Sequence, residues 1–235
     1  MSVRMKIKKQ PTCLTIVEVM IIIVIGAALV WVFIPYLAGR VTAHAQQSKQ
    51  VNNLRGITMV CHLYAQDNEG VFPTGTEPGS ANTNANTILQ DLFATGEIGL
   101  EALFWNPRST HVCAPEPPNE DGTLDPGENA FDYISGLEDS SPRNLPLLVE
   151  AQTGENQWRH DHGHPREHNV VVAYVDASTA ILETDRKTES IHVEHASGGQ
   201  VHLLSISDEA GTTPGNLPAH AEVKHAAPPR GGGSR

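Results

Sequence analysis

The sequence predicts an α+β protein in which a long N-terminal transmembrane-plus-amphipathic helix packs on a small antiparallel β-sheet head. Three observations lead to this prediction. An unbroken apolar run lies near the N-terminus, a polar segment with a helically spaced apolar stripe follows it, and short β-rich runs fill much of the second half. A group of strands after a long helix is typical of the α+β class.

The apolar run, residues 14–39, is long enough for a transmembrane helix. Its ~25 apolar or Gly residues would form ~37 Å of helix, against a bilayer core of ~30 Å. A basic leader, residues 1–13, carries four Lys or Arg, and only Arg40 follows closely. The positive-inside rule then places the N-terminus in the cytoplasm and the rest of the chain across the membrane. A cleaved secretory signal is the alternative, which the length of the run disfavours.

One carboxylate, Glu18, lies near the start of the apolar run. A carboxylate costs about 2.5–3.5 kcal/mol at the centre of a membrane helix and less near its edge. Glu18 can therefore reach water at the interface, or it can pair with a positive group of a neighbouring chain. The residues around it favour pairing.

The basic leader, residues 14–18 (LTIVE) and the apolar run resemble the N-terminus of type IV prepilins and type II secretion pseudopilins. The resemblance implies that a prepilin peptidase cuts between Cys13 and Leu14 and methylates the new N-terminus. It also implies that Glu18 binds the free amine of a neighbouring subunit during assembly, and that Pro35 bends the helix. The family normally has Gly before the cut, so Cys13 is a departure that bears on processing.

The helix is expected to continue as an amphipathic half, residues 40–70. Its apolar stripe has helical spacing and consists of Val51, Leu54, Ile57, Cys61 and Tyr64. Gly70 is the expected left-handed cap. Residues 52–55 (NNLR) and 63–73 (LYAQDNEGVFP) resemble the corresponding segment of planctomycete-type pilin-like proteins, and residues 112–115, 131–137 and 168–176 match that family loosely. The resemblance implies a pilin-like fold.

The head is predicted to occupy residues 71–207. Short helical turns are expected at 87–92 and 99–105, and the strand candidates are 131–135, 145–149, 170–176, 179–183 and 200–205. Residues 176–178 are expected to form a hairpin turn. From residue 208 to 235 the chain is rich in Pro, Gly, Ala and charged residues, which predicts a disordered tail.

Two cysteines would remain in the extracytoplasmic part of the chain after cleavage, Cys61 and Cys113. They can form a disulfide, which an extracytoplasmic compartment permits, or stay as two buried free thiols. The sequence slightly favours free thiols.

Two segments carry potential metal ligands. Asp121, Asp125 and Glu128 could offer oxygens to Ca²⁺, although a solvated acidic turn is favoured over a site. The imidazoles of His160, His162 and His164, with His168 nearby, could bind Zn²⁺ or Cu²⁺, although a surface loop is favoured. The histidines at 192, 195 and 202 are expected to lie on different faces, because strand alternation would separate them.

Composition and motifs exclude several function classes. The net charge is −11, and the basic leader carries four of the positive charges, so the remainder of the chain is at −15 and repels nucleic-acid phosphates. GxSxG, HExxH and P-loop motifs are missing from the sequence, so we expect no enzyme and no cofactor other than the Ca²⁺ considered above.

The resemblance implies a structural subunit of a type II secretion pseudopilus or type IV pilus-like filament, assembled from the bacterial inner membrane. Its expected partners are copies of itself or other pilin-like subunits, a prepilin peptidase and an inner-membrane assembly platform. The expected location is a single pass in the inner membrane, with a periplasmic or extracellular head. The alternative is a membrane-anchored binding or scaffolding protein that keeps a pilin-type anchor and never polymerises, and Cys13 favours this alternative.

Overall fold

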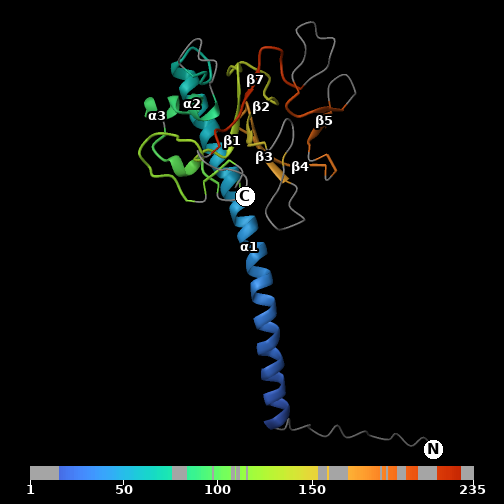
Figure 1. The fold of residues 1–235 in the computed structure, drawn as a ribbon. Coiled ribbons are helices and arrows are strands. Elements are labelled where there is room, and N and C mark those ends of the chain that lie inside the picture. Colours follow the sequence, from blue (N-terminus) through green and yellow to red (C-terminus); the bar gives the residue numbers. More distant parts are fainter. Residues whose placement is uncertain are drawn as a thin grey trace, which may run out of the picture. The chain divides into compact units, whose positions relative to one another are not determined.

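The structure is a computed structural model of the 235-residue chain (Figure 1). It describes residues 16–75, 84–96, 98–106, 109, 112–114, 116–152, 158, 169–185, 187–188, 190–194, 200–205 and 216–228; for 32 and 34–44 it describes the backbone alone. The chain divides into two compact units, residues 1–46 and 47–235. The second unit contains the sheet and is called the head below.

The first element, α1, is an α-helix over Ile16–Asp67. Its C-terminal end is closed by two residues with positive φ, Glu69 and Gly70. The Gly70 N–H donates to the Ala65 carbonyl at 2.7 Å, so a carbonyl of the last turn has a partner. The predicted glycine cap is confirmed.

The transmembrane assignment of residues 14–39 is corrected. Among the described residues, no helix has both the length and the apolar character that a membrane span requires. The prediction counted residues 14 and 15, which lie outside the described part, and several whose side chains are not described.

The C-terminal part of α1 supplies one side of the head's core. Leu54, Ile57 and Cys61 are fully buried, and Val51 and Tyr64 pack against the same cluster. The predicted apolar stripe is therefore confirmed. The Asn53 side chain donates to the Leu103 carbonyl at 2.9 Å, which ties this face of α1 to the segment that follows the short helices.

The sheet of the head has five antiparallel strands in the order β4-β3-β2-β1-β7. The strands are β1 (Phe131–Ser135), β2 (Pro146–Glu150), β3 (Asn169–Tyr174), β4 (Thr179–Glu183) and β7 (Glu222–Lys224). The α+β class, the antiparallel sheet and the first four strand positions were predicted from the sequence. The turn at 176–178 joins β3 to β4, with Ala177 at φ 59°.

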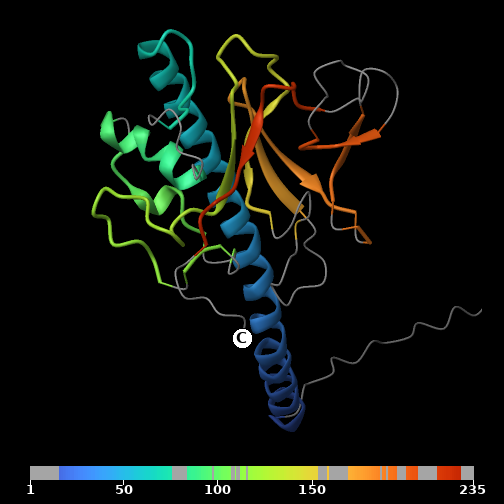
Figure 2. The same cartoon turned by 45° about the horizontal axis from the view of Figure 1, so that its top comes forward.

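Helices and a second small sheet complete the head (Figure 2). Figure 2 shows the short helices α2 (Ala85–Leu89) and α3 (Asp91–Ala94) beside the C-terminal part of α1, and α2 also contacts β1 of the sheet. A 3-10 turn, η1 (Glu101–Leu103), follows them. Strands β5 (His192–Glu194) and β6 (Gln200–His202) form the second sheet. Every residue of β1 and β2 is buried, so both faces of the central sheet are covered.

The prediction of disorder over residues 208–235 is wrong for the described residues 216–228. Within them β7 pairs with β1, placing Ile134 opposite Val223. The Ala85 N–H donates to the His225 carbonyl at 2.9 Å, and the Gly127 N–H donates to the Ala227 carbonyl at 2.8 Å. These long-range hydrogen bonds order a segment whose composition alone suggests disorder.

A close approach between β1 and the C-terminal segment leads to a prediction at Gly136. This glycine has φ +83°, and an added Cβ would lie 2.5 Å from the His220 carbonyl oxygen. Gly136→Ala should lower the free energy of unfolding by about 2 kcal/mol, through backbone strain and the clash. Urea denaturation of the full-length protein measures the change.

Gly56 is the matched control, because it lies inside α1 and no described atom comes within 4 Å of an added Cβ. Gly56→Ala should raise stability by roughly 0.5–1 kcal/mol, since it removes chain entropy from the unfolded state. Equal effects at the two positions would contradict the close approach at Gly136.

Candidate assembly surface

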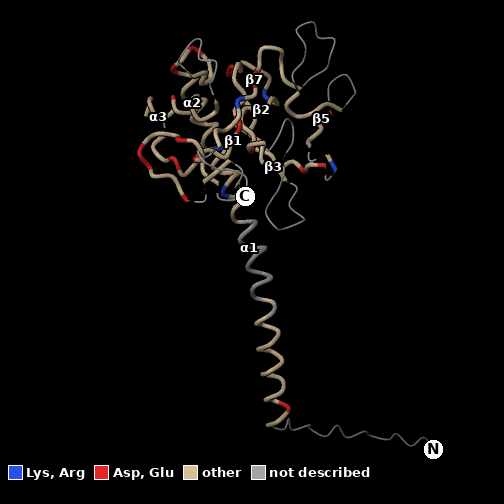
Figure 3. The backbone as a smooth tube through the Cα atoms, viewed as in Figure 1, with Lys and Arg blue, Asp and Glu red and all other residues tan. Residues whose placement is uncertain are grey.

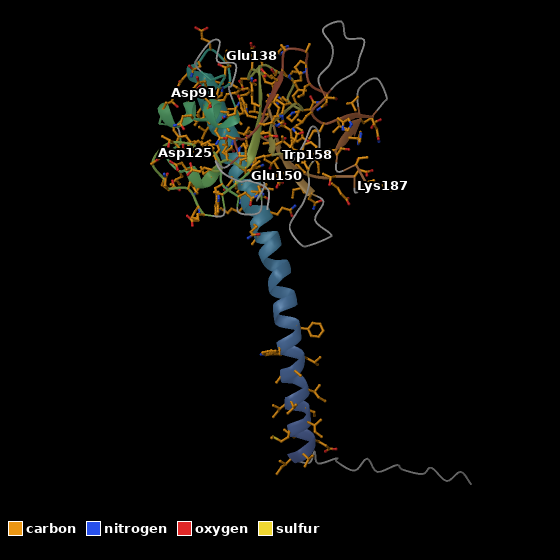
Figure 4. All side chains as sticks on the ribbon, viewed as in Figure 1. Asp91, Asp125, Glu138, Glu150, Trp158 and Lys187 are labelled. Carbon is orange, nitrogen blue, oxygen red and sulfur yellow. The ribbon has the colours of Figure 1, made fainter. Side chains whose placement is uncertain are left out.

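The N-terminal part of α1 exposes large apolar side chains on all of its sides (Figure 4). Among the described side chains of this part, thirteen are exposed: Ile16, Val17, Val19, Met20, Ile21, Ile22, Ile23, Val24, Ile25, Leu29, Val30, Trp31 and Phe33. We call these thirteen residues the apolar helix surface. Soluble monomers rarely expose apolar patches beyond a few hundred Å², and larger ones mark interaction sites. This surface is therefore the candidate functional site of the chain.

A single acidic residue, Glu18, lies within this apolar surface (Figure 3). It occupies the first turn of α1, where the helix dipole favours a negative charge. Burial of a carboxylate is costly unless it is paired and hydrogen-bonded, so Glu18 distinguishes this end of the apolar helix surface from the rest of it.

The structure describes only some of the other residues that the sequence assigns to processing and bending. Cys13 and Leu14 lie outside the described residues. At Pro35 the backbone is helical, and α1 runs on through this position to Asp67. The bend implied by the family resemblance stays a prediction.

Both cysteines of the head are free and buried. Burial raises the pKa of the Cys61 thiol to about 12, and burial likewise raises that of Cys113 to about 12. Thiols with pKa values this high carry little thiolate at neutral pH and are poor nucleophiles and metal ligands. The disulfide alternative is not realised, and the two residues act as small core side chains.

The acidic loop, residues 116–128, folds around carboxylates that bind backbone N–H groups. Glu101 is fully buried, and its carboxylate accepts from the N–H groups of Glu120, Gly122 and Thr123. In return, the Glu120 carboxylate accepts from the N–H groups of Glu101 and Ala102 at 3.0 and 3.1 Å. This reciprocal arrangement fixes the loop against η1.

Two of the three residues considered for Ca²⁺ use carboxylate oxygens in hydrogen bonds within the acidic loop. Asp121 accepts from the N–H and the hydroxyl of Thr123, and these hydrogen bonds lower its pKa. Glu128 accepts from the Asp125 N–H at 2.8 Å, while burial raises the pKa of the Glu128 carboxyl. Within the described ranges, no three His, Cys, Asp or Glu side chains are grouped to hold a metal ion. The histidines at 160, 162, 164 and 168 lie outside those ranges.

A buried carboxylate on β1, which the sequence reading missed, organises the C-terminal segment. Asp132 is 1% exposed and accepts from the Ala226 N–H at 2.8 Å and the Gln152 N–H at 3.0 Å. The His225 imidazole lies 3.1 Å from the same carboxylate. Nearby, the Asn86 side chain accepts from the Ala227 N–H at 2.9 Å. An Asp inside an otherwise apolar strand, FDYIS, was the signal that could have indicated this cluster.

The aromatic residue Trp158 provides a second buried polar contact beside the sheet. Its indole N–H donates to the Glu150 carbonyl at 2.7 Å, and Figure 4 shows the two residues close together. The indole is buried and its polar atom is satisfied, so the contact serves packing at the end of β2. It offers no reactive group.

Comparison with known proteins adds no relative: the chain matches no family model, no curated protein and no solved structure.

The contact between Asp132 and His225 predicts a pH dependence of stability. The hydrogen bond from Asp132 raises the pKa of His225, against the opposing effect of partial burial. The protonated imidazole therefore stabilises the folded state fully below its ordinary pKa of ~6.5, and this contribution is lost as the pH rises through the raised value. His225→Gln should remove that slope, measured as urea midpoints of both proteins between roughly pH 6 and 8.5. Parallel curves for the two proteins would contradict the prediction.

Proposed function

We propose that this chain is a structural subunit of a filament, of the type II secretion pseudopilus or type IV pilus-like class, and that the apolar helix surface joins its subunits. The observation that carries the proposal is the contrast between this surface and the head. The head buries most of its described large apolar side chains in one core, with scattered exceptions such as Ile181, whereas the thirteen residues of the apolar helix surface are exposed together. A neighbouring helix of the same kind would cover them.

The magnitude of the hydrophobic effect supports association. Full burial of a large aliphatic side chain contributes about 1.5–3 kcal/mol. Covering half of the thirteen exposed side chains would then contribute roughly 10–20 kcal/mol, while association costs an estimated 4–15 kcal/mol. Contacts with several neighbours, as inside a helical bundle, would exceed that cost clearly.

The pairing of the Glu18 carboxylate would fix how neighbouring helices align. In the family that the N-terminus resembles, this glutamate binds the free amine of a neighbouring subunit, and we propose the same role here. A buried carboxylate without a partner costs several kcal/mol, so alignments that leave Glu18 unpaired are disfavoured. The head would then lie outside the cytoplasm, on the outer side of the filament.

The competing function is a binding or scaffolding protein that keeps a pilin-type N-terminus and does not polymerise. Cys13 favours it, because the family normally has Gly before the cut. Without the cut, the amine partner of Glu18 would be missing, and the register argument would fail. Assembly state and N-terminal processing therefore separate the two functions.

The assembly prediction is tested on the full-length protein, purified in detergent and then transferred to detergent-free buffer. Wild type should form regular filaments, seen by negative-stain electron microscopy and as large species in sedimentation velocity. Ile22→Gln with Ile25→Gln should shift the protein to small species, because two exposed apolar side chains of α1 become polar.

Two further variants separate specific assembly from aggregation. Ile181→Gln is the matched control, since Ile181 is an exposed isoleucine of the head, and it should assemble like wild type. Glu18→Gln keeps the apolar side chains and removes the charge, so regular filaments should be lost. Amorphous aggregates from wild type, or filaments from Glu18→Gln, would contradict the proposal.

The processing prediction concerns the N-terminus of the chain made in cells that contain a prepilin peptidase. Intact mass and N-terminal sequencing should show a chain that begins at N-methylated Leu14. Cys13→Gly restores the residue usual in the family and should be processed at least as completely. A chain that still begins at Met1 would argue against the pilin mechanism and in favour of the non-polymerising function.

A further inference from the structure

The small sheet of the head places two histidines directly opposite each other. In the antiparallel pair of β5 and β6, His192 is the partner of His202, and Glu194 is the partner of Gln200. The sequence reading expected these histidines on different faces. That expectation is wrong because opposed residues of antiparallel strands point to the same face of a sheet.

The alternation of burial fixes which face carries the histidines. Along the two strands and their flanks, Ile191, Val201 and Leu203 are buried in the head. His192 is exposed and His202 is half-buried on the opposite face. The Leu203 N–H also donates to the Ile191 carbonyl at 2.9 Å, so the ribbon is anchored where the two strands meet the core. The strand backbones that carry the two imidazoles are therefore fixed to the core of the head.

The two imidazole rings lie close together, and one ring nitrogen has no hydrogen-bond partner among the described residues. Their ring centroids are 4.2 Å apart, at an interplanar angle of 39°. Nδ1 of His202 is buried and has no hydrogen-bond partner among the described residues. A buried polar atom without a partner costs about 1–3 kcal/mol and is uncommon in folded proteins, so it requires an explanation.

The ring positions suit a shared metal ion. Two imidazoles that bind one ion at ~2.0 Å, with a nitrogen–metal–nitrogen angle of about 90–110°, have ring centres ~4.5–5 Å apart. The observed 4.2 Å is within a small ring rotation of this arrangement, and the terminal torsion of histidine is soft. An ion would also give the unpartnered nitrogen a ligand bond.

We propose that His192 and His202 form a binding site for a divalent transition metal that prefers imidazole ligands, with Cu²⁺ ahead of Zn²⁺ in affinity. In the described part of the chain no third His, Cys, Asp or Glu side chain completes a group of ligands here. The remaining coordination positions are therefore open to water or to an external ligand. The site lies wholly within the head and does not rest on the assembly role of α1.

Isothermal titration of the full-length protein in detergent with Cu²⁺, and separately with Zn²⁺, tests the site. Wild type should bind one Cu²⁺ per chain at this position, and His192→Gln should weaken that binding more than tenfold. Losing a direct ligand should weaken the affinity at least as much as losing a group that orients a ligand, which typically costs 10–100-fold. The electron paramagnetic resonance spectrum of the Cu²⁺ complex should show two coordinating nitrogens.

Matched controls distinguish this pair from other ligands of the chain. Glu194→Gln changes the same face of the ribbon and should leave the affinity unchanged. His160→Gln combined with His162→Gln and His164→Gln should also retain the site. Equal affinity of His192→Gln and wild type, or loss of binding only in the triple variant, would overturn the proposal. Circular dichroism confirms that each variant is folded.

Discussion

The head depends on the apolar stripe that the C-terminal part of α1 presents to the sheet. Leu54 and Ile57 are fully buried, and each contributes about 1.5–3 kcal/mol relative to an exposed position. Tyr133 on β1 is fully buried in the same cluster, so strand and helix share one core. The strands alone would leave a broad apolar face in water. Helix and sheet therefore form as one cooperative unit, although they are distant in sequence.

The arrangement of apolar residues around α1 differs between its two ends. This difference limits which kind of partner can cover the N-terminal part of the helix. Near Leu54 the apolar residues follow one stripe, which matches a single packed face. Between Ile16 and Trp31 most positions carry exposed large apolar side chains, which point to every side. One flat partner surface cannot cover such a helix. A bundle of similar helices can, which is the physical reason to favour several equivalent neighbours over one docking partner.

The sequence predicted the parts of the fold that local patterns determine. The strands Phe131–Ser135 and Thr179–Glu183 begin and end where β-rich runs suggested. Strand β7 was missed because it is three residues long and owes its order to distant partners, Asp132 and Asn86, which no local pattern reveals. The opposed histidines were missed for a related reason. Whether alternation separates or joins two residues depends on the register between strands, which a single sequence does not determine.

Polar groups in the head are satisfied largely by buried or half-buried side chains of the head itself. Glu101 and Asp132 each accept from at least two backbone N–H groups. The Gln90 side chain donates to the Gly122 carbonyl and accepts from the Leu124 N–H. These side chains fix long loops, because each is hydrogen-bonded to backbone groups of loop residues. The loops are consequently fixed before any partner binds. If α1 joins copies of this chain, as proposed, these loops need no refolding for that association.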